Sequence, residues 1–143
     1  MAAFYFAAVL FIVADRAIKY GVVNGIISEP KIFGDFFRID FAKNYQIAFS
    51  LPLQGKIVFA LIVVVALAFG YYFVSLFKEK RPEAIFAFLV FLGSMSNLMD
   101  RINYGFVVDY LYLKYFTVFN LADVAIVIGV AGLLFSWRRV DKK

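Results

Sequence analysis

The sequence contains no cysteine and no histidine among its 143 residues. The absence of cysteine excludes disulfides, thiolate nucleophiles and zinc–thiolate sites. The absence of histidine excludes Ser–His triads, histidine-bound metals and most imidazole acid–base chemistry. If the protein is an enzyme, its carboxylates, lysines and hydroxyl groups must therefore carry out the chemistry.

Charge is absent from one long stretch, residues 57–77, in a chain that is 64% hydrophobic and has a mean hydropathy of +0.86. A helix of this length, at about 1.5 Å per residue, spans about 31 Å, which is the thickness of the hydrocarbon layer of a bilayer. The composition therefore predicts a membrane protein and not a soluble domain.

Four apolar segments are each close to the length that crosses a membrane: residues 2–23, 57–77, 83–99 and 121–137. We expect an all-α membrane protein with four transmembrane helices, built as one integral membrane domain over residues 1–143. The first segment lacks the basic start and the clear cleavage site of a secretory signal peptide, so we interpret it as a retained anchor.

Two further stretches have the pattern of strands. Residues 37–44 alternate apolar and polar side chains with a period of two, and residues 106–113 are rich in β-branched and aromatic residues. These patterns predict a small extracytoplasmic β-sheet on the membrane surface.

The net charge is +5, and basic residues cluster beside the apolar segments. One cluster, in a short loop, is Lys78, Lys80 and Arg81, and the other, at the C-terminus, is Arg138, Arg139, Lys142 and Lys143. By the positive-inside rule, both termini and the 78–82 loop are cytoplasmic, and the loops 24–56 and 100–120 face outward. No basic stripe interleaved with aromatic residues is present, so we expect no nucleic-acid binding.

Two acids stand out against the apolar background: Asp109, in Gly105-Phe-Val-Val-Asp-Tyr, and Asp123, in Phe119-Asn-Leu-Ala-Asp-Val. A charge at the centre of a membrane helix costs roughly 2.5–3.5 kcal/mol even on mild insertion scales. Each acid also has a structural interpretation. Asp123 lies three residues after Asn120 and fits a helix cap, and Asp109 could be the solvent-facing residue of a strand.

If the two carboxylates meet, like charges about 4 Å apart repel by about 4 kcal/mol at an effective dielectric of 20. A helix N-terminus offsets only about 0.3–1 kcal/mol of this repulsion. The pair should then share one proton near neutral pH, as in an aspartic protease. One carboxylate would activate a water while the other donates a hydrogen bond to the scissile carbonyl, and the sequence does not assign the shared proton to either aspartate.

The third segment ends in a polar cluster of Asn97, Asp100 and Arg101, with the first two on one helical face. This cluster is either a polar helix end at the interface or an orienting shell for the two acids. Asp15 and Lys19 are four residues apart in the first segment, where they can neutralise each other in a structural or a functional role.

Asn44 is either a turn residue or one of the polar residues around Asp109 and Asp123. The polar candidates come from four separate stretches but are predicted to lie at one membrane face: Asp15, Asn44, Asn97, Asp100, Arg101, Asp109, Asn120 and Asp123. A small transporter or ion-conducting protein, and a scaffold whose acids only cap helices, are the alternatives. A pathway requires polar residues through the bilayer, and the second segment offers almost none, so the clustering favours a site over a pore.

Five ordered motifs resemble those of lipoprotein signal peptidase, the bacterial signal peptidase II family: Asp15-x-x-x-Lys19, Asn44-Tyr-Gln-Ile-Ala-Phe-Ser50, Gly93-Ser-Met-Ser-Asn-Leu-Met-Asp-Arg101, Gly105-Phe-Val-Val-Asp109 and Phe119-Asn-Leu-Ala-Asp123. The resemblance covers nearly the whole chain. It implies that Asp109 and Asp123 are the catalytic pair and that Asp15, Lys19, Asn44, Asn97, Arg101 and Asn120 surround them.

The resemblance also implies the activity, which is cleavage of a prolipoprotein's signal peptide just before its diacylglyceryl-modified cysteine. The family acts in the bacterial cytoplasmic (inner) membrane among membrane lipids, uses no metal or cofactor and is blocked by globomycin. We expect a monomer with its active site at the outer face. Gln46 and Ser96 stand where the family usually has glycine. Each adds a side chain where the backbone could otherwise approach a neighbouring segment or the substrate closely.

Overall fold

The computed structural model describes residues 2–27, 31–34, 36–45 and 56–140. Its elements, in chain order, are α1 (Ala2–Val23), β1 (Lys31–Phe33), β2 (Phe37–Asn44), α2 (Lys56–Lys78), α3 (Ala84–Tyr104), β3 (Val107–Leu113) and α4 (Leu121–Val140). All four predicted helical segments are helices. Both predicted extended stretches are strands, and β1 is a strand that the sequence analysis did not predict.

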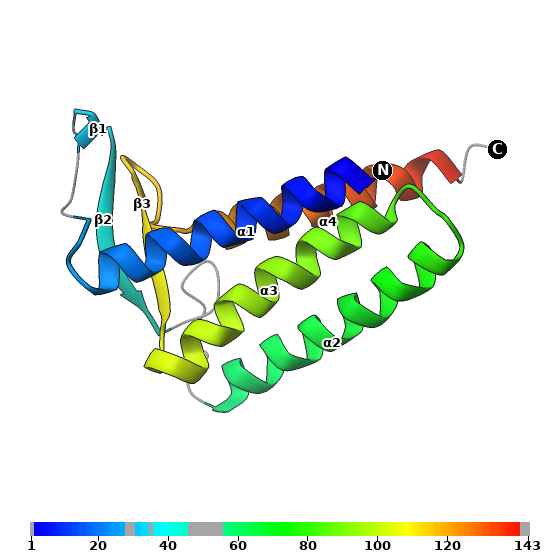
Figure 1. Ribbon diagram of the computed structural model, residues 1–143, viewed down its shortest axis with the longest axis horizontal. Coiled ribbons are helices and arrows are strands. Elements are labelled where there is room, and N and C mark those ends of the chain that lie inside the picture. Colours follow the sequence, from blue (N-terminus) through cyan, green and yellow to red (C-terminus); the bar gives the residue numbers. More distant parts are fainter. Residues whose placement is uncertain (1, 28–30, 35, 46–55, 141–143) are drawn as a thin grey trace.

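The helices lie lengthwise beside one another, and the sheet stands at one end of them (Figure 1). The beginning of α1, the turn between α2 and α3 and the end of α4 lie at the opposite end. The helix α3 is central, since it packs against α1, α2 and α4. The sheet is antiparallel with the order β1-β2-β3. The ends of three helices therefore meet the sheet, and residues distant in sequence come together there.

The third helix is longer than predicted, because it continues past Met99 to Tyr104. Its last turns remain amphipathic. Asn97 and Asp100 are buried toward the other helices, while Met99 and Ile102 are exposed. Gly105 ends the helix with a φ of 80° and donates its N–H to the carbonyl of Arg101. The predicted outer loop is correspondingly shorter, and Asp100 and Arg101 belong to α3.

Close contact between α3 and α4 depends on glycine. A Cβ added at Gly93 would lie 2.5 Å from the carbonyl oxygen of Ala122, and one added at Gly129 would lie 2.6 Å from that of Phe86. Small residues at such positions let helix backbones approach closely, as in membrane helix pairs. The glycine at position 93 thereby holds the start of α4 against the part of α3 that carries Asn97.

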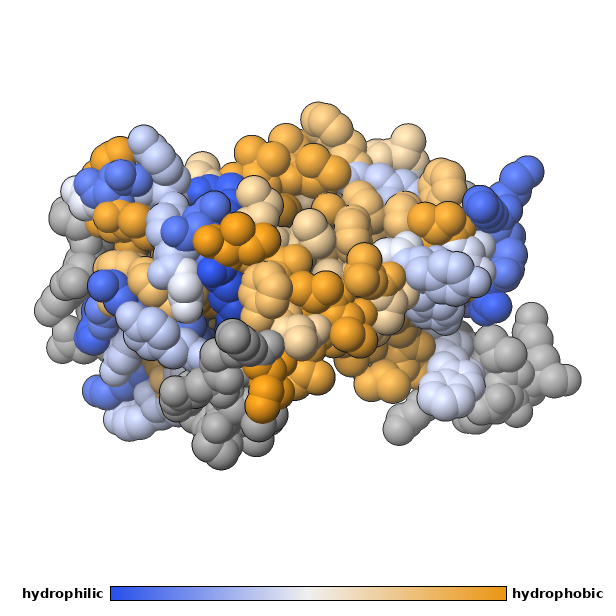
Figure 2. Space-filling view, turned by 90° about the horizontal axis from the view of Figure 1, so that it is seen from below, coloured by the Kyte–Doolittle hydropathy of each residue, from blue (hydrophilic) through white to orange (hydrophobic). Residues whose placement is uncertain are grey.

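Large apolar side chains cover much of the outside of the helices (Figure 2). Hydrophobic residues fill the middle of this face and hydrophilic residues lie at its two ends. Among the described residues, two helical stretches, Phe59–Lys78 and Ala84–Tyr104, are long and apolar enough to cross a membrane, and Leu121–Trp137 is a shorter apolar helix. Exposed side chains such as Leu67 and Tyr71 on α2 suit contact with lipid.

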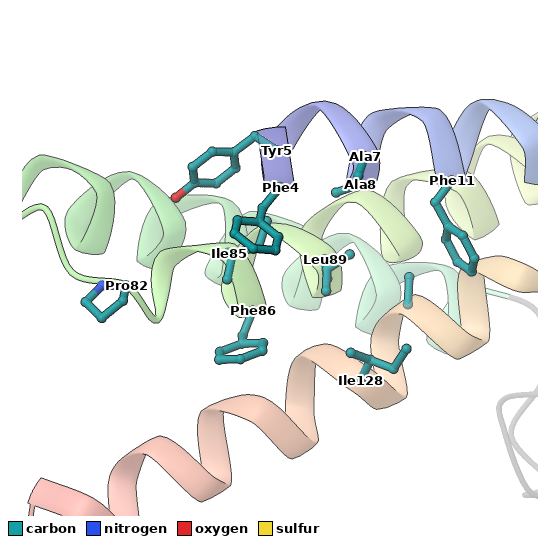
Figure 3. Close-up of a pocket in the computed structure, with 11 residues that line it drawn as sticks. Phe4, Tyr5, Ala7, Ala8, Phe11, Pro82, Ile85, Phe86, Leu89 and Ile128 are labelled. Carbon is teal, nitrogen blue, oxygen red and sulfur yellow. The ribbon is translucent and has the colours of Figure 1, made fainter. Parts of the chain in front are cut away.

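An apolar pocket of about 520 Å³ lies between α1, α3 and α4 (Figure 3). Its lining includes Phe4, Phe11, Phe86, Leu89 and Ile128, and its described lining contains no acid or base. The polar chemistry of the molecule is therefore found elsewhere, at the end where the helices meet the sheet.

Candidate active site

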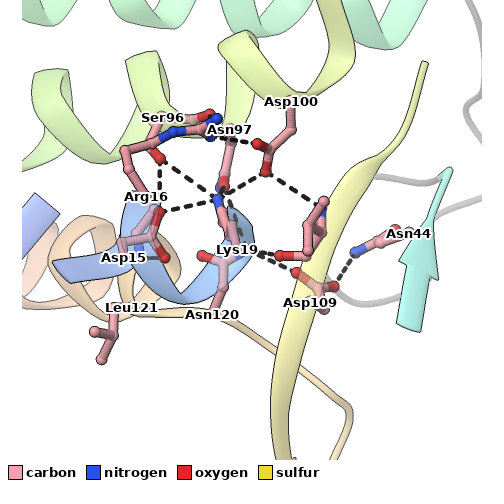
Figure 4. Close-up of polar contacts among 12 residues, drawn as sticks. Asp15, Arg16, Lys19, Asn44, Ser96, Asn97, Asp100, Asp109, Asn120 and Leu121 are labelled. Carbon is pink, nitrogen blue, oxygen red and sulfur yellow. Dashed lines mark hydrogen bonds and ion pairs between the residues drawn. The ribbon is translucent and has the colours of Figure 1, made fainter. Parts of the chain in front are cut away.

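Asp109 lies on β3 with only 2% of its surface exposed. In the antiparallel register Ala42 is opposite Asp109, and Asn44 is two residues further along β2. The Nδ2 of Asn44 donates to Oδ2 of Asp109 at 2.8 Å, and the Nδ2 of Asn120 donates to Oδ1 at 2.7 Å. Asp109 is therefore a buried acid held by two amides (Figure 4), and its interpretation as a solvent-facing strand residue is wrong.

Asp123 lies in the first turn of α4 and forms the predicted cap with Asn120. The backbone N–H of Asn120 donates to Oδ2 of Asp123 at 3.2 Å, and the N–H of Asp123 donates to Oδ1 of Asn120 at 2.9 Å. Such a reciprocal pair satisfies N–H groups that have no partner within the helix. Asn97 adds a third contact, because its Nδ2 donates to Oδ1 of Asp123 at 2.8 Å.

Asn120 links the two acids. Its side-chain nitrogen binds Asp109, its side-chain oxygen accepts from the backbone of Asp123, and it is fully buried. Burial raises the pKa of Asp109 to about 7, and the charge of Asp123 is the second cause. Repulsion between the two carboxylates is therefore not the main cause of the raised pKa. The structure gives the larger part to desolvation, because Asp109 lies within the protein and away from water.

A second group of charges lies beside the pair, where the Nζ of Lys19 is 3.0 Å from Asp15 and 2.8 Å from Asp100. Arg16 also forms an ion pair with Asp100. The 3.0 Å distance confirms the predicted pairing of Asp15 with Lys19. Asp15, Lys19 and Asp100 are all almost completely buried. Two acids and two bases balance one another here, which limits the cost of removing them from water.

This charged group orients the amide of Asn97. The Nζ of Lys19 donates to Oδ1 of Asn97 at 3.0 Å, so the Nδ2 of that amide faces the other way, toward Asp123. A reversed amide would place two donors together. Lys19 on α1 and Asn120, whose Nδ2 also donates to Oδ1 of Asn97 at 3.3 Å, thus favour the orientation in which the Nδ2 of Asn97 faces Asp123.

Arg101 is partly buried on α3 and interacts electrostatically with Asp109, Asp123 and Asp100. The structure therefore brings together every residue that the sequence analysis selected, from α1, β2, α3, β3 and the start of α4. Among the described residues, no group of three or more acids, histidines or cysteines is arranged to hold a metal ion.

The sequence analysis missed three members of the network. Arg16 was visible only as a neighbour of Asp15, and Tyr110 had the pattern of an ordinary strand aromatic. Ser96 was noted only for its bulk, yet its hydroxyl donates to Asp15 at 2.6 Å and accepts from Lys19 at 3.4 Å. The position of Ser96, a polar residue directly before Asn97, was the signal that could have indicated its part in the network. Gln46, the other departure from the family pattern, lies outside the described residues.

The comparisons with known proteins agree with one another. A family model described as Signal peptidase (SPase) II matches residues 7–138. The lipoprotein signal peptidase of Halothermothrix orenii is 32% identical over 138 residues, covering 94% of this chain and 95% of the relative. That of Chlorobaculum parvum is also 32% identical, over 94% of both chains, and that of Clostridioides difficile is 31% identical over 87% of both.

Two solved structures share the fold. A bacterial membrane enzyme solved by the in meso method at 2.3 Å superimposes with a TM-score of 0.80 at 24% identity, over 97% of this chain and 89% of the other. A second, solved at 1.9 Å, has a TM-score of 0.75 over 96% and 93% of the two chains. The family match extends over the segments that carry all the residues of the site, and the chain belongs to the signal peptidase II family.

Proposed function

We propose that Asp109 and Asp123 are the catalytic carboxylates with which this protein cleaves prolipoproteins. Members of the signal peptidase II family are proteases that remove signal peptides from prolipoproteins, and this chain is an enzyme of that kind. The substrate bond we propose is the one just before the diacylglyceryl-modified cysteine. The aspartyl mechanism follows from the family, and the assignment to these two residues is the proposal.

One observation carries the assignment: a buried acid with a pKa of about 7 is joined to a second acid through a single asparagine. Perturbed acids with a specific partner are typical of functional sites. The capping role of Asp123 is compatible with catalysis, since the cap fixes the carboxylate at a helix start where it faces the amide of Asn97.

In the proposed mechanism the pair holds one proton near neutral pH. The ionised carboxylate removes a proton from a water, which attacks the scissile carbonyl, and the protonated carboxyl donates a hydrogen bond to the carbonyl oxygen. Asn44, Asn97 and Asn120 hold the carboxyl oxygens in place without neutralising them by proton transfer. Arg101 lies within electrostatic range of both acids and would stabilise the negative charge that develops.

We further propose a single domain, residues 1–143, whose four helices all cross the membrane, with both termini cytoplasmic and the site at the outer face. The helices α1 and α4 lie alongside the two apolar helices and run in opposite directions, which supports four spans (Figure 1). The charges of Asp15 and Lys19 on α1 are buried inside the protein, so they do not oppose insertion. The basic residues of the 78–82 loop support the orientation. A monomer and inhibition by globomycin are parts of the same proposal.

The test is cleavage of a diacylglyceryl-modified precursor peptide by purified Asp109→Asn and Asp123→Asn variants. Asparagine is nearly the same size but cannot ionise, so each variant should stay folded and lose at least about 100-fold in rate. Asp40→Asn is the matched control, because Asp40 is part-exposed and pairs with Arg38 at 2.8 Å on β2. Near-normal cleavage by either active-site variant would contradict the assignment, and unfolding of both would favour a purely structural role.

A further inference from the structure

Tyr110, directly after Asp109 on β3, is the largest completely buried side chain described in the protein. A phenylalanine would fill the same space, so the hydroxyl needs its own explanation. It donates to Oδ1 of Asp15 at 2.9 Å and accepts from the backbone N–H of Leu121 at 3.2 Å. The hydroxyl therefore joins β3 to α1 and to the first residue of α4.

The start of α4 is held by side chains from three places. Leu121 donates its N–H to Tyr110, Ala122 donates its N–H to Oδ1 of Asp15 at 3.3 Å, and Asp123 donates its N–H to Asn120. The first N–H groups of a helix have no partner within the helix, and each of these three is satisfied by a different side chain. Asn120 alone would cap the helix, so Tyr110 and Asp15 add a constraint on where the helix begins.

That constraint acts on both proposed catalytic acids. Tyr110 is bonded covalently to Asp109, and its hydroxyl holds the turn that contains Asp123. We propose that Tyr110 is a positioning residue whose hydroxyl fixes the strand of Asp109 against the first turn of α4. This inference rests on the proposed role of the two aspartates and concerns a residue outside that pair.

The hydroxyl is suited to a permanent double contact. Burial raises the pKa of Tyr110 above its ordinary value, and the neighbouring Asp15 carboxylate raises it further. The phenol therefore keeps its proton at neutral pH. It can donate to Asp15 and accept from Leu121 at the same time.

The test compares Tyr110→Phe with Tyr112→Phe in the full-length protein in detergent. Both changes remove one hydroxyl from β3. Tyr112 is only partly buried, and its ring lies under the guanidinium of Arg38 at 3.8 Å. We expect Tyr110→Phe to lower kcat for a diacylglyceryl-modified precursor peptide about 10- to 100-fold and to leave KM within about twofold, because misplacement of reacting groups affects the chemical step. Tyr112→Phe should match the wild type.

Amide hydrogen exchange separates positioning from a general structural role. In Tyr110→Phe, exchange should rise about tenfold or more in the segment 119–124 and remain unchanged in the segment 130–137 of the same helix. A kcat within twofold of the wild type would overturn the inference. So would faster exchange throughout α4, a loss of the folded protein, or an equal loss of activity in Tyr112→Phe.

A failure of the positioning role of Tyr110 can be distinguished from a failure of the proposed function. If the wild type does not cleave the precursor, or if Asp109→Asn and Asp123→Asn remain active, the proposed function fails. If both aspartate variants are inactive while Tyr110→Phe is fully active, only the positioning role of Tyr110 is wrong.

Discussion

Two pairs of aspartates lie where the helices meet the sheet, Asp15 with Asp100 and Asp109 with Asp123, and their surroundings differ. Asp15 and Asp100 contact cations, because Lys19 lies within 3.0 Å of both and Arg16 forms an ion pair with Asp100. Asp109 and Asp123 accept hydrogen bonds from asparagine side-chain amides, and Arg101 lies within electrostatic range of both. The first pair lies against buried cations, and the second is the pair that we propose for proton transfer.

The difference shows how one apolar protein can use the same side chain in two ways. An opposite charge at close range stabilises a carboxylate as an anion, whereas an amide donor stabilises it less and leaves the effect of burial in place. Burial then raises the pKa of Asp109 to about 7. In the proposed function, the pair held by cations supports the framework of the site, and the pair held by amides carries out the proton chemistry.

The largest loss of stability should come from Lys19→Met, which removes the cation shared by Asp15 and Asp100. Breaking a buried ion pair by removal of one partner typically costs about 3–5 kcal/mol, since it leaves an uncompensated charge. We expect thermal unfolding in detergent to shift to clearly lower temperature.

Two controls sharpen this prediction. Lys43→Met changes an exposed lysine on β2 and should alter stability by about 1 kcal/mol or less. Adding Asp15→Asn to Lys19→Met removes the acid that loses its ion pair, whereas Asp100 keeps its ion pair with Arg16, and should recover part of the lost stability. If Lys19→Met unfolds at the wild-type temperature, Asp15 and Asp100 do not depend on that cation.

A smaller effect is expected from Asn97→Leu, which removes the amide between the two groups. Lys19 loses an acceptor and Asp123 loses a donor, so the variant should lose about 1–3 kcal/mol of stability. Its kcat should fall about tenfold, because Asp123 is less firmly placed. The matched control is Asn103→Leu on the exposed face of α3, which should retain wild-type kcat. Equal kcat values for the two leucine variants would contradict the link from Lys19 through Asn97 to Asp123.

Much of this arrangement could be predicted from the sequence. The helices follow from the lengths of the apolar segments, the strand at residues 37–44 from its period of two, and the pairing of Asp15 with Lys19 from their spacing. The cap of Asn120 with Asp123 follows from local chemistry. The end of α3 was predicted too early, because its last turns mix polar and apolar residues and the apolar run alone ended at Met99.

Contacts between distant segments were harder to predict. The burial of Asp109 depends on how β3 packs against the helix ends, and nothing in Phe-Val-Val-Asp-Tyr indicates which strand face is covered. The hydroxyl of Tyr110 finds Asp15 and Leu121 only in the folded protein. The larger effect of burial over repulsion on the pKa of Asp109 also required the three-dimensional structure.

The most direct test of the central claim is infrared difference spectroscopy of protonated carboxyl groups between pH 5 and 9. A protonated acid has a carbonyl stretch that a carboxylate lacks. Since the pKa of Asp109 is raised to about 7, the wild type should hold one protonated carboxyl below about pH 7 and lose it as the pH rises through that value. Asp109→Asn should remove this signal at neutral pH, and Asp40→Asn should leave it unchanged. The absence of a protonated carboxyl in the wild type at pH 6, or its persistence in Asp109→Asn, would contradict the account.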